Sequence, residues 1–145
     1  MSKIEAFLTT EQEQTIVEAI KIAEKNTSGE IRVHIEKETN KPPLEKALEV
    51  FYSLEMDKTE QQNGVLIYIA VESKQFAILG DEGINSKVPE NFWDLEKELM
   101  LSHFKKEEYS KGIELAILKV GEKLKEFFPY QNDDSNELSD EISKG

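Results

Sequence analysis

The chain has 145 residues and a formal net charge of −12, with 38% hydrophobic and 33% charged residues. This length suits a single domain with its own core, and the acidic excess disfavours binding to nucleic acid or to an anionic membrane surface. The absence of cysteine excludes disulfides and Cys-type zinc sites, and two histidines are too few for a histidine-rich metal site. The acidity has two interpretations: solubility through self-repulsion, or a cluster of carboxylates that holds a cation.

The beginning of the chain has no apolar stretch of the signal-peptide type. No apolar run approaches the roughly 18 residues that a membrane-spanning helix needs. We therefore expect a cytoplasmic, monomeric protein that does not insert directly into a membrane.

The first predicted helix begins near Thr10, which can cap it while Glu13 returns the hydrogen bond as in a capping box. Apolar residues at helical spacing give it one buried face, and a polar segment at 26–29 ends it. Residues 30–36 then alternate strictly between apolar and polar side chains, which predicts a half-buried strand with His34 on the polar side.

A second helix is predicted from Pro43, because proline is favoured in the first turn. Its apolar face is predicted to consist of Leu44, Ala47, Leu48, Phe51 and Leu54. Two apolar runs follow, at 65–71 and 76–79, separated by a short polar break. They predict a β-hairpin of buried strands, and the segment 80–87 after it reads as a polar loop.

The last two helices are predicted from about Pro89 and over 109–127. The apolar residues of the first of these, Phe92, Leu95 and Leu99, indicate its buried side. Residues 129–145 are polar and acidic and have too little apolar surface to fold alone, so we expect a single domain over 1–128 and a disordered acidic tail over 129–145. The order of elements predicts an α/β fold, with helices on both faces of a small mixed sheet.

Oxygen-bearing side chains flank the predicted hairpin. Asn63 precedes its first strand, and Asp81 and Glu82 follow its second. The start of the first strand of a hairpin lies beside the end of the second, so these residues should meet at one edge of the sheet. A strand–helix–strand crossover is normally parallel, which brings Glu30 to the same edge, and the loop that carries Asp57 arrives there too.

Carboxylates that are packed together repel one another, and a hard cation relieves this repulsion. An all-oxygen set in flexible loops suits Ca²⁺ better than Mg²⁺, which requires tighter octahedral geometry. The alternative is that the pair after the hairpin is only a polar turn and Glu30 a solvated strand end. The predicted metal ligands are Glu30, Asp57, Asn63, Asp81 and Glu82.

Four segments resemble, in the same order and spacing, the successive motifs of the TPM domain family: Ser-Gly-Glu-Ile-Arg-Val at 28–33, Asn-Gly-Val-Leu-Ile at 63–67, Gly-Asp-Glu-Gly-Ile at 80–84 and Tyr-Ser-Lys-Gly-Ile at 109–113. This family is named after a thylakoid-lumen phosphatase, a photosystem II repair factor and a modulator of nicotinic receptors. The resemblance spans about Thr10 to Phe128. Lys87-Val88 and Phe92-Trp93 make it most similar to the stand-alone soluble bacterial branch.

The resemblance implies a three-layer α/β/α sandwich, a divalent-cation site, often calcium, in the loops around the sheet edge, and an acid phosphatase activity. Position by position, Glu30, Asn63 and the loop 80–83 match the family pattern, and Asp57 matches only approximately because its loop varies in length. Many membrane-linked relatives carry Gly-x-Gly where this chain has Gly80-Asp81-Glu82-Gly83, so the ligands in that loop depart from theirs.

Two functions therefore stand side by side. One is a soluble calcium-binding module, in which the cation orders loops that contact a partner protein. The other is a metal-dependent acid phosphatase for small phosphate esters, with Ca²⁺ or Mg²⁺ bound and Glu30 or Asp81 as the base. The strong acidity of the edge and the lack of a cation clearly placed to hold phosphate favour the binding module.

Overall fold

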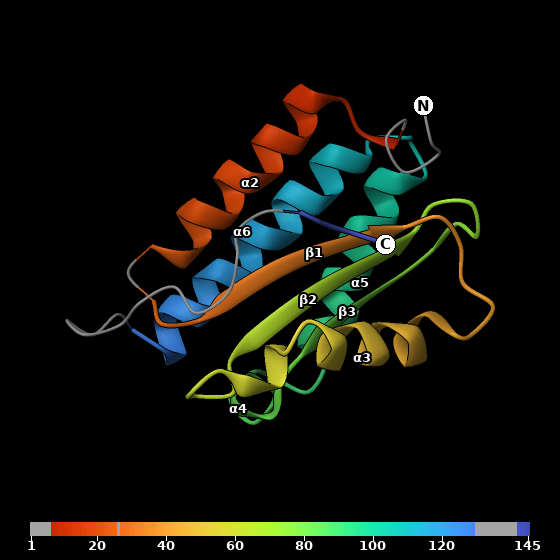
Figure 1. Ribbon diagram of the computed structural model, residues 1–145. Helices are drawn as coiled ribbons and strands as arrows, with labels where there is room; N and C mark the ends of the chain where they lie inside the picture. Colours follow the sequence, from red (N-terminus) through yellow and green to blue (C-terminus); the bar gives the residue numbers. More distant parts are fainter. Residues whose placement is uncertain (1–6, 26, 130–141) are drawn as a thin grey trace.

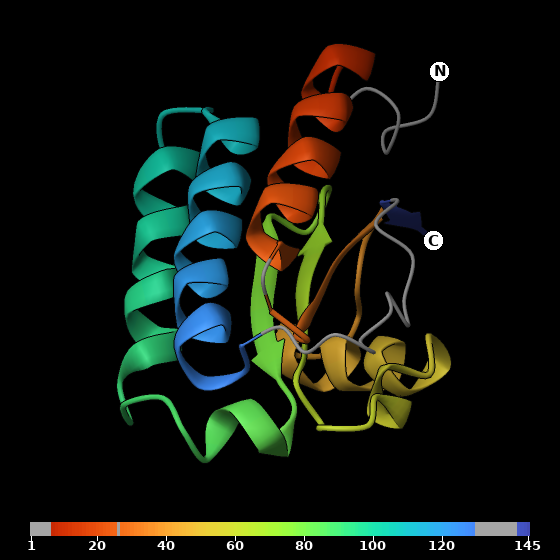
Figure 2. The ribbon, with the colours of Figure 1, turned by 90° about the vertical axis from the view of Figure 1, so that its left-hand side faces the viewer.

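A four-stranded sheet separates two layers of helices in the computed structural model, which describes residues 7–25, 27–129 and 142–145 (Figure 1). The elements are α2 (Thr10–Glu24), β1 (Glu30–Glu36), α3 (Pro43–Ser53), the 3₁₀ helix η1 (Met56–Lys58), β2 (Gly64–Ala70), β3 (Gln75–Gly80), α4 (Glu82–Asn85), α5 (Phe92–Phe104), α6 (Tyr109–Phe127) and β4 (Ser143–Lys144). Helices α2, α5 and α6 cover one face of the sheet and α3 covers the other (Figure 2).

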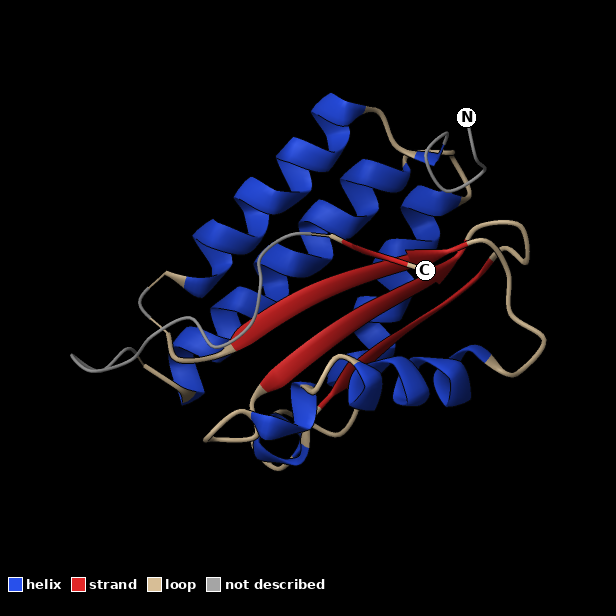
Figure 3. Cartoon of the chain, in the orientation of Figure 1, coloured by secondary structure: helices blue, strands red, loops and turns tan. Residues whose placement is uncertain are grey.

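The strands lie in the order β3-β2-β1-β4 (Figure 3). β1 pairs in parallel with β2, β2 pairs antiparallel with β3, and β4 adds in parallel to β1. The sheet is therefore mixed, as predicted, and the three-layer α/β/α sandwich is confirmed. No helix in the described part of the chain is long and apolar enough to cross a membrane.

Strand β2 is the centre of the core, because all seven of its residues are buried. Alternate residues of a strand point to opposite faces, so Val65, Ile67 and Ile69 join the cluster formed with α2, α5 and α6. Their neighbours Leu66 and Tyr68 join the second cluster, formed with α3. The continuous apolar run thus follows from a strand that is covered on both sides.

Two local features differ from the predictions. The capping box of α2 uses Thr9 and Gln12 instead of Thr10 and Glu13, which sets the helix one residue earlier. The predicted loop 80–87 contains the short helix α4, which Asp81 caps. Such short elements depend on one local hydrogen bond, which apolar periodicity does not reveal.

The buried side of α5 differs in part from the predicted one, because Phe92 is buried as expected but Leu95 is not. Phe92, Glu96 and Met100 face the core, whereas Leu95 is 54% exposed. Both sets of residues have helical spacing, so the apolar pattern alone does not choose between them. On α3, Leu44 and Leu48 are exposed at 57% and 44%, whereas Ala47 and Phe51 are buried as predicted, together with Val50.

Most of the predicted acidic tail lies outside the described residues. At its end, Ser143 and Lys144 form β4, with Ser143 opposite His34, and the Lys144 Nζ lies 2.5 Å from a carboxylate oxygen of Glu13. For these two residues the structure differs from the predicted disorder, because β1 has an edge free for pairing.

Glu96 supplies a test of this core. Burial raises its pKa to about 7, from an ordinary value of 4.5, and the charge of Lys119 only partly offsets this. Because the folded pKa lies above the unfolded one, the contribution of Glu96 to stability is complete below pH 4.5 and is lost as the pH rises through about 7. We expect Glu96→Gln to raise the free energy of unfolding by about 2 kcal/mol at about pH 8, with little change at about pH 4.

Urea denaturation of both proteins at the two pH values measures this difference. Glu98→Gln is the matched control, because Glu98 is exposed on the same helix and its substitution should have little effect at either pH. An equal gain from Glu96→Gln at both pH values would contradict the prediction, since it would reflect packing and not ionisation.

Candidate functional site

The candidate site lies at the edge of the sheet where β1 and β2 begin and β3 ends. Glu30 lies opposite Gly64 in the parallel pair. The Asp81 N–H donates to the Gly64 carbonyl oxygen at 2.9 Å, and the Glu30 N–H donates to the Asn63 carbonyl oxygen at 3.4 Å. These backbone hydrogen bonds hold Glu30, Asn63 and Asp81 on three adjacent strands at one edge, the arrangement that the crossover and the hairpin predict.

Asn63 is an internal residue of this edge and not only part of a turn. It is 1% exposed, its N–H donates to the Thr59 hydroxyl at 3.3 Å, and its Nδ2 donates to the Ser28 hydroxyl at 3.2 Å. Its Oδ1 is buried and has no hydrogen-bond donor within the described part of the chain. A buried acceptor without a donor is costly, so this oxygen is a candidate cation ligand.

Asp81 ends the third strand and caps α4. Its Oδ1 accepts a hydrogen bond from the Glu82 N–H at 2.8 Å, whereas its Oδ2 is buried without a donor among the described residues. Burial raises the pKa of the Asp81 carboxyl, the hydrogen bond from the Glu82 N–H lowers it, and the charges of Glu82 and Asp57 raise it further. The surroundings of Asp81 at this edge therefore disfavour the ionised form of its carboxyl group.

The remaining predicted ligands are placed less centrally. Glu30 is 2% exposed at the start of β1, Asp57 is half-buried in η1, and Glu82 is exposed on α4. Among the residues that the structure describes, no three histidine, aspartate or glutamate side chains are grouped closely enough to hold a metal ion. The five predicted residues thus lie at one edge, but their carboxylates do not form a complete metal-coordination site.

A contact that the sequence does not reveal joins α4 to the loop before β2. A Cβ atom built on Gly83 would lie 2.1 Å from the Gln61 carbonyl oxygen and 2.4 Å from that of Gln62, so only glycine allows this approach. Gln62 itself has a left-handed backbone, with φ 52°. The close approach brings backbone carbonyl oxygens next to the segment that carries Asp81 and Glu82.

A chain of hydrogen bonds supports this edge from behind. The Trp93 Nε1–H donates to the Asn85 Oδ1 at 2.7 Å, and the Asn85 Nδ2 donates to the Gly80 carbonyl oxygen at 2.8 Å. The Trp93 ring also packs closely over Gly80. Trp93, which the sequence indicates only as part of the family resemblance, thus fixes the end of β3.

A second polar cluster, absent from the predicted site, lies at the other end of β1. The His34 Nε2 is 3.1 Å from the Glu36 Oε1, the His34 Nδ1 is 3.0 Å from the Ser143 hydroxyl, and the Tyr68 hydroxyl bonds the other oxygen of Glu36. His34 is 7% exposed, and burial lowers its pKa. The prediction that it lies on the polar side of its strand holds, but the side chain is buried by β4 and its neighbours.

The oxygen atoms at the edge that carries Asn63 and Asp81 meet some of the requirements of a hard cation. The Asn63 and Asp81 oxygens without donors are suitable ligands for Ca²⁺, and backbone carbonyl oxygens lie nearby at Gln61 and Gln62. Because no three carboxylates of the described residues converge, water would have to complete the coordination.

Comparison with known proteins identifies the family. The model of the TPM domain matches residues 2–123, so the chain belongs to the TPM domain family. No curated protein matches it. The chain is similar to the BA42 protein of the psychrophilic bacterium Bizionia argentinensis, whose NMR structure shares 51% identity over 100% of both chains with a TM-score of 0.90.

Two more distant solution structures share the fold. The N-terminal domain of a protein from P. gingivalis is 16% identical, with a TM-score of 0.72 over 87% of this chain and 83% of that one. The N-terminal domain of the cg2496 protein from Corynebacterium glutamicum is 13% identical, with a TM-score of 0.65 over 83% and 76%. At these identities, the likeness concerns the fold alone.

The Gly83 contact gives a test of the site's architecture. We expect Gly83→Ala to lower the free energy of unfolding by about 1–3 kcal/mol, because its methyl group would collide with backbone oxygens that cannot rotate away. Chemical denaturation measures the loss. Ser86→Ala, on the exposed end of α4, loses only one hydrogen bond of 3.2 Å to Gly83 and should change stability by about 0.5 kcal/mol or less. Unchanged stability of Gly83→Ala would contradict the close packing of α4 on the loop.

Proposed function

We propose that this protein is a divalent-cation-binding module that takes Ca²⁺ at the edge where β1 and β2 begin and β3 ends. One observation carries the proposal: two oxygen atoms at this edge, the Asn63 Oδ1 and the Asp81 Oδ2, are buried and have no donor in the described part of the chain. Leaving such an atom unsatisfied costs about 1–3 kcal/mol. A bound cation offsets this cost at both atoms.

The charges around Asp81 support a cation in preference to a neutral ligand. The negative charges of Glu82 and Asp57 both raise the pKa of the Asp81 carboxyl. A positive ion at this edge stabilises the ionised form, so proton and cation compete for Asp81. Cation affinity is therefore expected to increase as the pH rises through the pKa of Asp81.

The ligand set favours Ca²⁺ over Mg²⁺ and a modest affinity. Amide, carboxylate and backbone oxygens on a loop and a short helix form an irregular site, which Ca²⁺ tolerates better than Mg²⁺ does. Because three acidic side chains do not converge, few charged ligands contribute. We expect a dissociation constant of about 10⁻⁴ to 10⁻³ M, the range of calcium sites with few charged ligands.

The role of the cation follows from what it would hold together. The Gly83 contact already joins α4 to the loop before β2, and an ion on Asn63 and Asp81 would tie the same two segments. Binding would thus reduce the motion of one surface region without changing the core. This is how a cation-dependent binding or regulatory module acts on a partner protein.

Calorimetric titration with Ca²⁺ tests the proposal. We expect wild-type protein to bind, and Asp81→Asn to bind at least about tenfold more weakly, because it loses one charged ligand. Asparagine also caps helices well, so this substitution should keep α4 folded.

Glu38→Gln is the matched control for the loss of one negative charge. Glu38 is exposed in the loop after β1, at the opposite end of the sheet. The affinity of the Glu38→Gln variant for Ca²⁺ should therefore equal that of the wild type. Equal losses for both variants would show that net charge, and not a site, attracts the ion. No heat and no thermal shift at millimolar Ca²⁺ would exclude the site.

Metal-dependent hydrolysis of small phosphate esters is the second candidate function. It is favoured by Lys58 and Lys87, which follow Asp57 and α4 and have no ion pair within the described residues. Hydrolysis of p-nitrophenyl phosphate with and without Ca²⁺ or Mg²⁺ separates the two functions. Turnover that needs both the metal and Asp81 would favour the phosphatase, and binding without turnover the module.

A further inference from the structure

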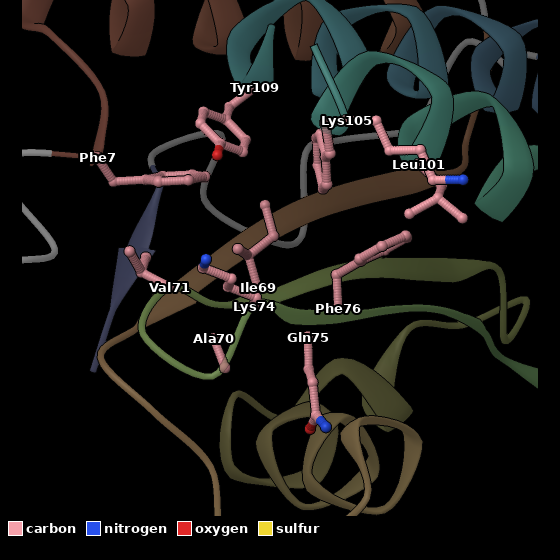
Figure 4. A pocket seen from close by; sticks show the side chains of 11 residues that line it. Phe7, Ile69, Ala70, Val71, Lys74, Gln75, Phe76, Leu101, Lys105 and Tyr109 are labelled. Carbon is pink, nitrogen blue, oxygen red and sulfur yellow. The ribbon is translucent and has the colours of Figure 1, made fainter. Parts of the chain in front are cut away.

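A pocket of about 450 Å³ lies at the end of the sheet opposite the cation edge, between the β2–β3 hairpin and the helices α5 and α6 (Figure 4). This volume is within the range of small-molecule pockets, about 300–1,000 Å³. Its walls are mostly apolar and come from three separate parts of the chain: Phe7, Ile69, Phe76, Leu101, Phe104 and Tyr109. We refer to it as the hairpin groove.

Aromatic rings form a continuous row along this groove. The ring centroids of Phe76 and Phe104 lie 5.0 Å apart, those of Phe104 and Tyr109 5.5 Å, and those of Tyr109 and Phe7 4.8 Å. Leu101, at the other end of the row, remains 40% exposed. The groove therefore presents a preformed apolar surface that the described part of the chain leaves open.

The charged side chains that line the groove are positive, whereas the protein as a whole has a negative net charge. Among the residues that the structure describes, the only charged ones lining it are Lys74 and Lys105, although the chain has a net charge of −12. Neither lysine forms an ion pair, and the Tyr109 hydroxyl has no hydrogen bond, among the residues that the structure describes. Figure 4 shows the amino group of Lys74 and the hydroxyl of Tyr109 at the Phe7 end, and Lys105 at the Leu101 end.

The backbone at Lys74 adds a further observation. Lys74 has a left-handed conformation, with φ 53°, in the turn where its N–H donates to the Val71 carbonyl oxygen at 3.3 Å. Glycine adopts this conformation without strain, whereas lysine does not. The turn thus keeps a strained residue whose cationic side chain lines the groove, a combination associated with binding sites.

We propose that the hairpin groove binds an amphipathic carboxylate, a molecule with a hydrocarbon body and one terminal carboxylate. The body lies along Phe76, Phe104 and Leu101. The carboxylate accepts hydrogen bonds from the Lys74 ammonium and the Tyr109 hydroxyl. One ammonium and one hydroxyl match a monoanion, whereas a phosphate would bring a second negative charge to a strongly acidic protein. This site is independent of the cation edge and of its function.

Calorimetry with hexanoate, octanoate and decanoate tests the apolar part of the groove. We expect the affinity to increase about fourfold for each added CH₂ group until the groove is filled. Octanol tests the head group, because it has the same body as octanoate without the charge. Octanoate should bind about tenfold more tightly than octanol, since a charge-assisted hydrogen bond is lost in the alcohol.

Lys74→Gly separates binding from folding. It should raise the melting temperature, because it removes the left-handed strain, while it lowers the affinity for octanoate about tenfold and leaves that for octanol unchanged. Lys125→Gln, an exposed position on α6 that does not line the groove, is the control for one lost positive charge and should leave both affinities unchanged. Leu101→Gln should weaken both ligands severalfold, because it shortens the apolar wall at an exposed position.

Four results would overturn the proposal. These are an absence of decanoate binding below its micelle concentration, an affinity that does not depend on chain length, an unchanged octanoate affinity in Lys74→Gly, and binding that appears only after deletion of residues 1–6. The last would mean that the chain's own beginning occupies the groove. Because Asp81→Asn leaves the groove intact, octanoate binding by this variant is expected whether or not the edge binds Ca²⁺.

Discussion

The complete burial of β2 is the constraint on which the rest of the structure depends. All seven residues of this strand are covered, and apolar side chains point to both faces. Both faces must then be closed, one by α2, α5 and α6 and the other by α3. Apart from the Tyr68 hydroxyl, which is bonded to Glu36, the side chains of the strand are apolar, so the two proposed sites lie at the two ends of β2.

These two ends have opposite character. At the beginning of β2, Asn63 and Asp81 contribute buried oxygen atoms without donors in the described residues, in a negative environment. After its end, Lys74 and Lys105 line an apolar groove that has no acidic residue among its described walls. A strand of seven residues separates the ends by roughly 20 Å, so a cation at one and an organic anion at the other would not compete.

The sequence predicts the elements whose patterns are strong and local. β1 extends over Glu30–Glu36 and α6 over Tyr109–Phe127, as expected from strict alternation and from a long apolar face. The common edge of Glu30, Asn63 and Asp81 was predictable too, because parallel crossovers and hairpins follow general rules of chain topology. The burial of Glu96 in place of Leu95, and the approach of Gly83 to the Gln61 carbonyl, were not predictable, because they depend on contacts between segments far apart in the chain.

The central claim is that the edge at Asn63 and Asp81 binds a divalent cation. Paramagnetic broadening of amide signals by substoichiometric Mn²⁺ tests it most directly, since Mn²⁺ takes oxygen ligands and broadens the nearest signals first. We expect the amide signals of Asn63, Gly64, Asp81 and Glu82 to broaden first in the wild type and to stay sharp in Asp81→Asn. Broadening that is centred on other acidic surfaces, or that is unchanged in Asp81→Asn, would contradict it.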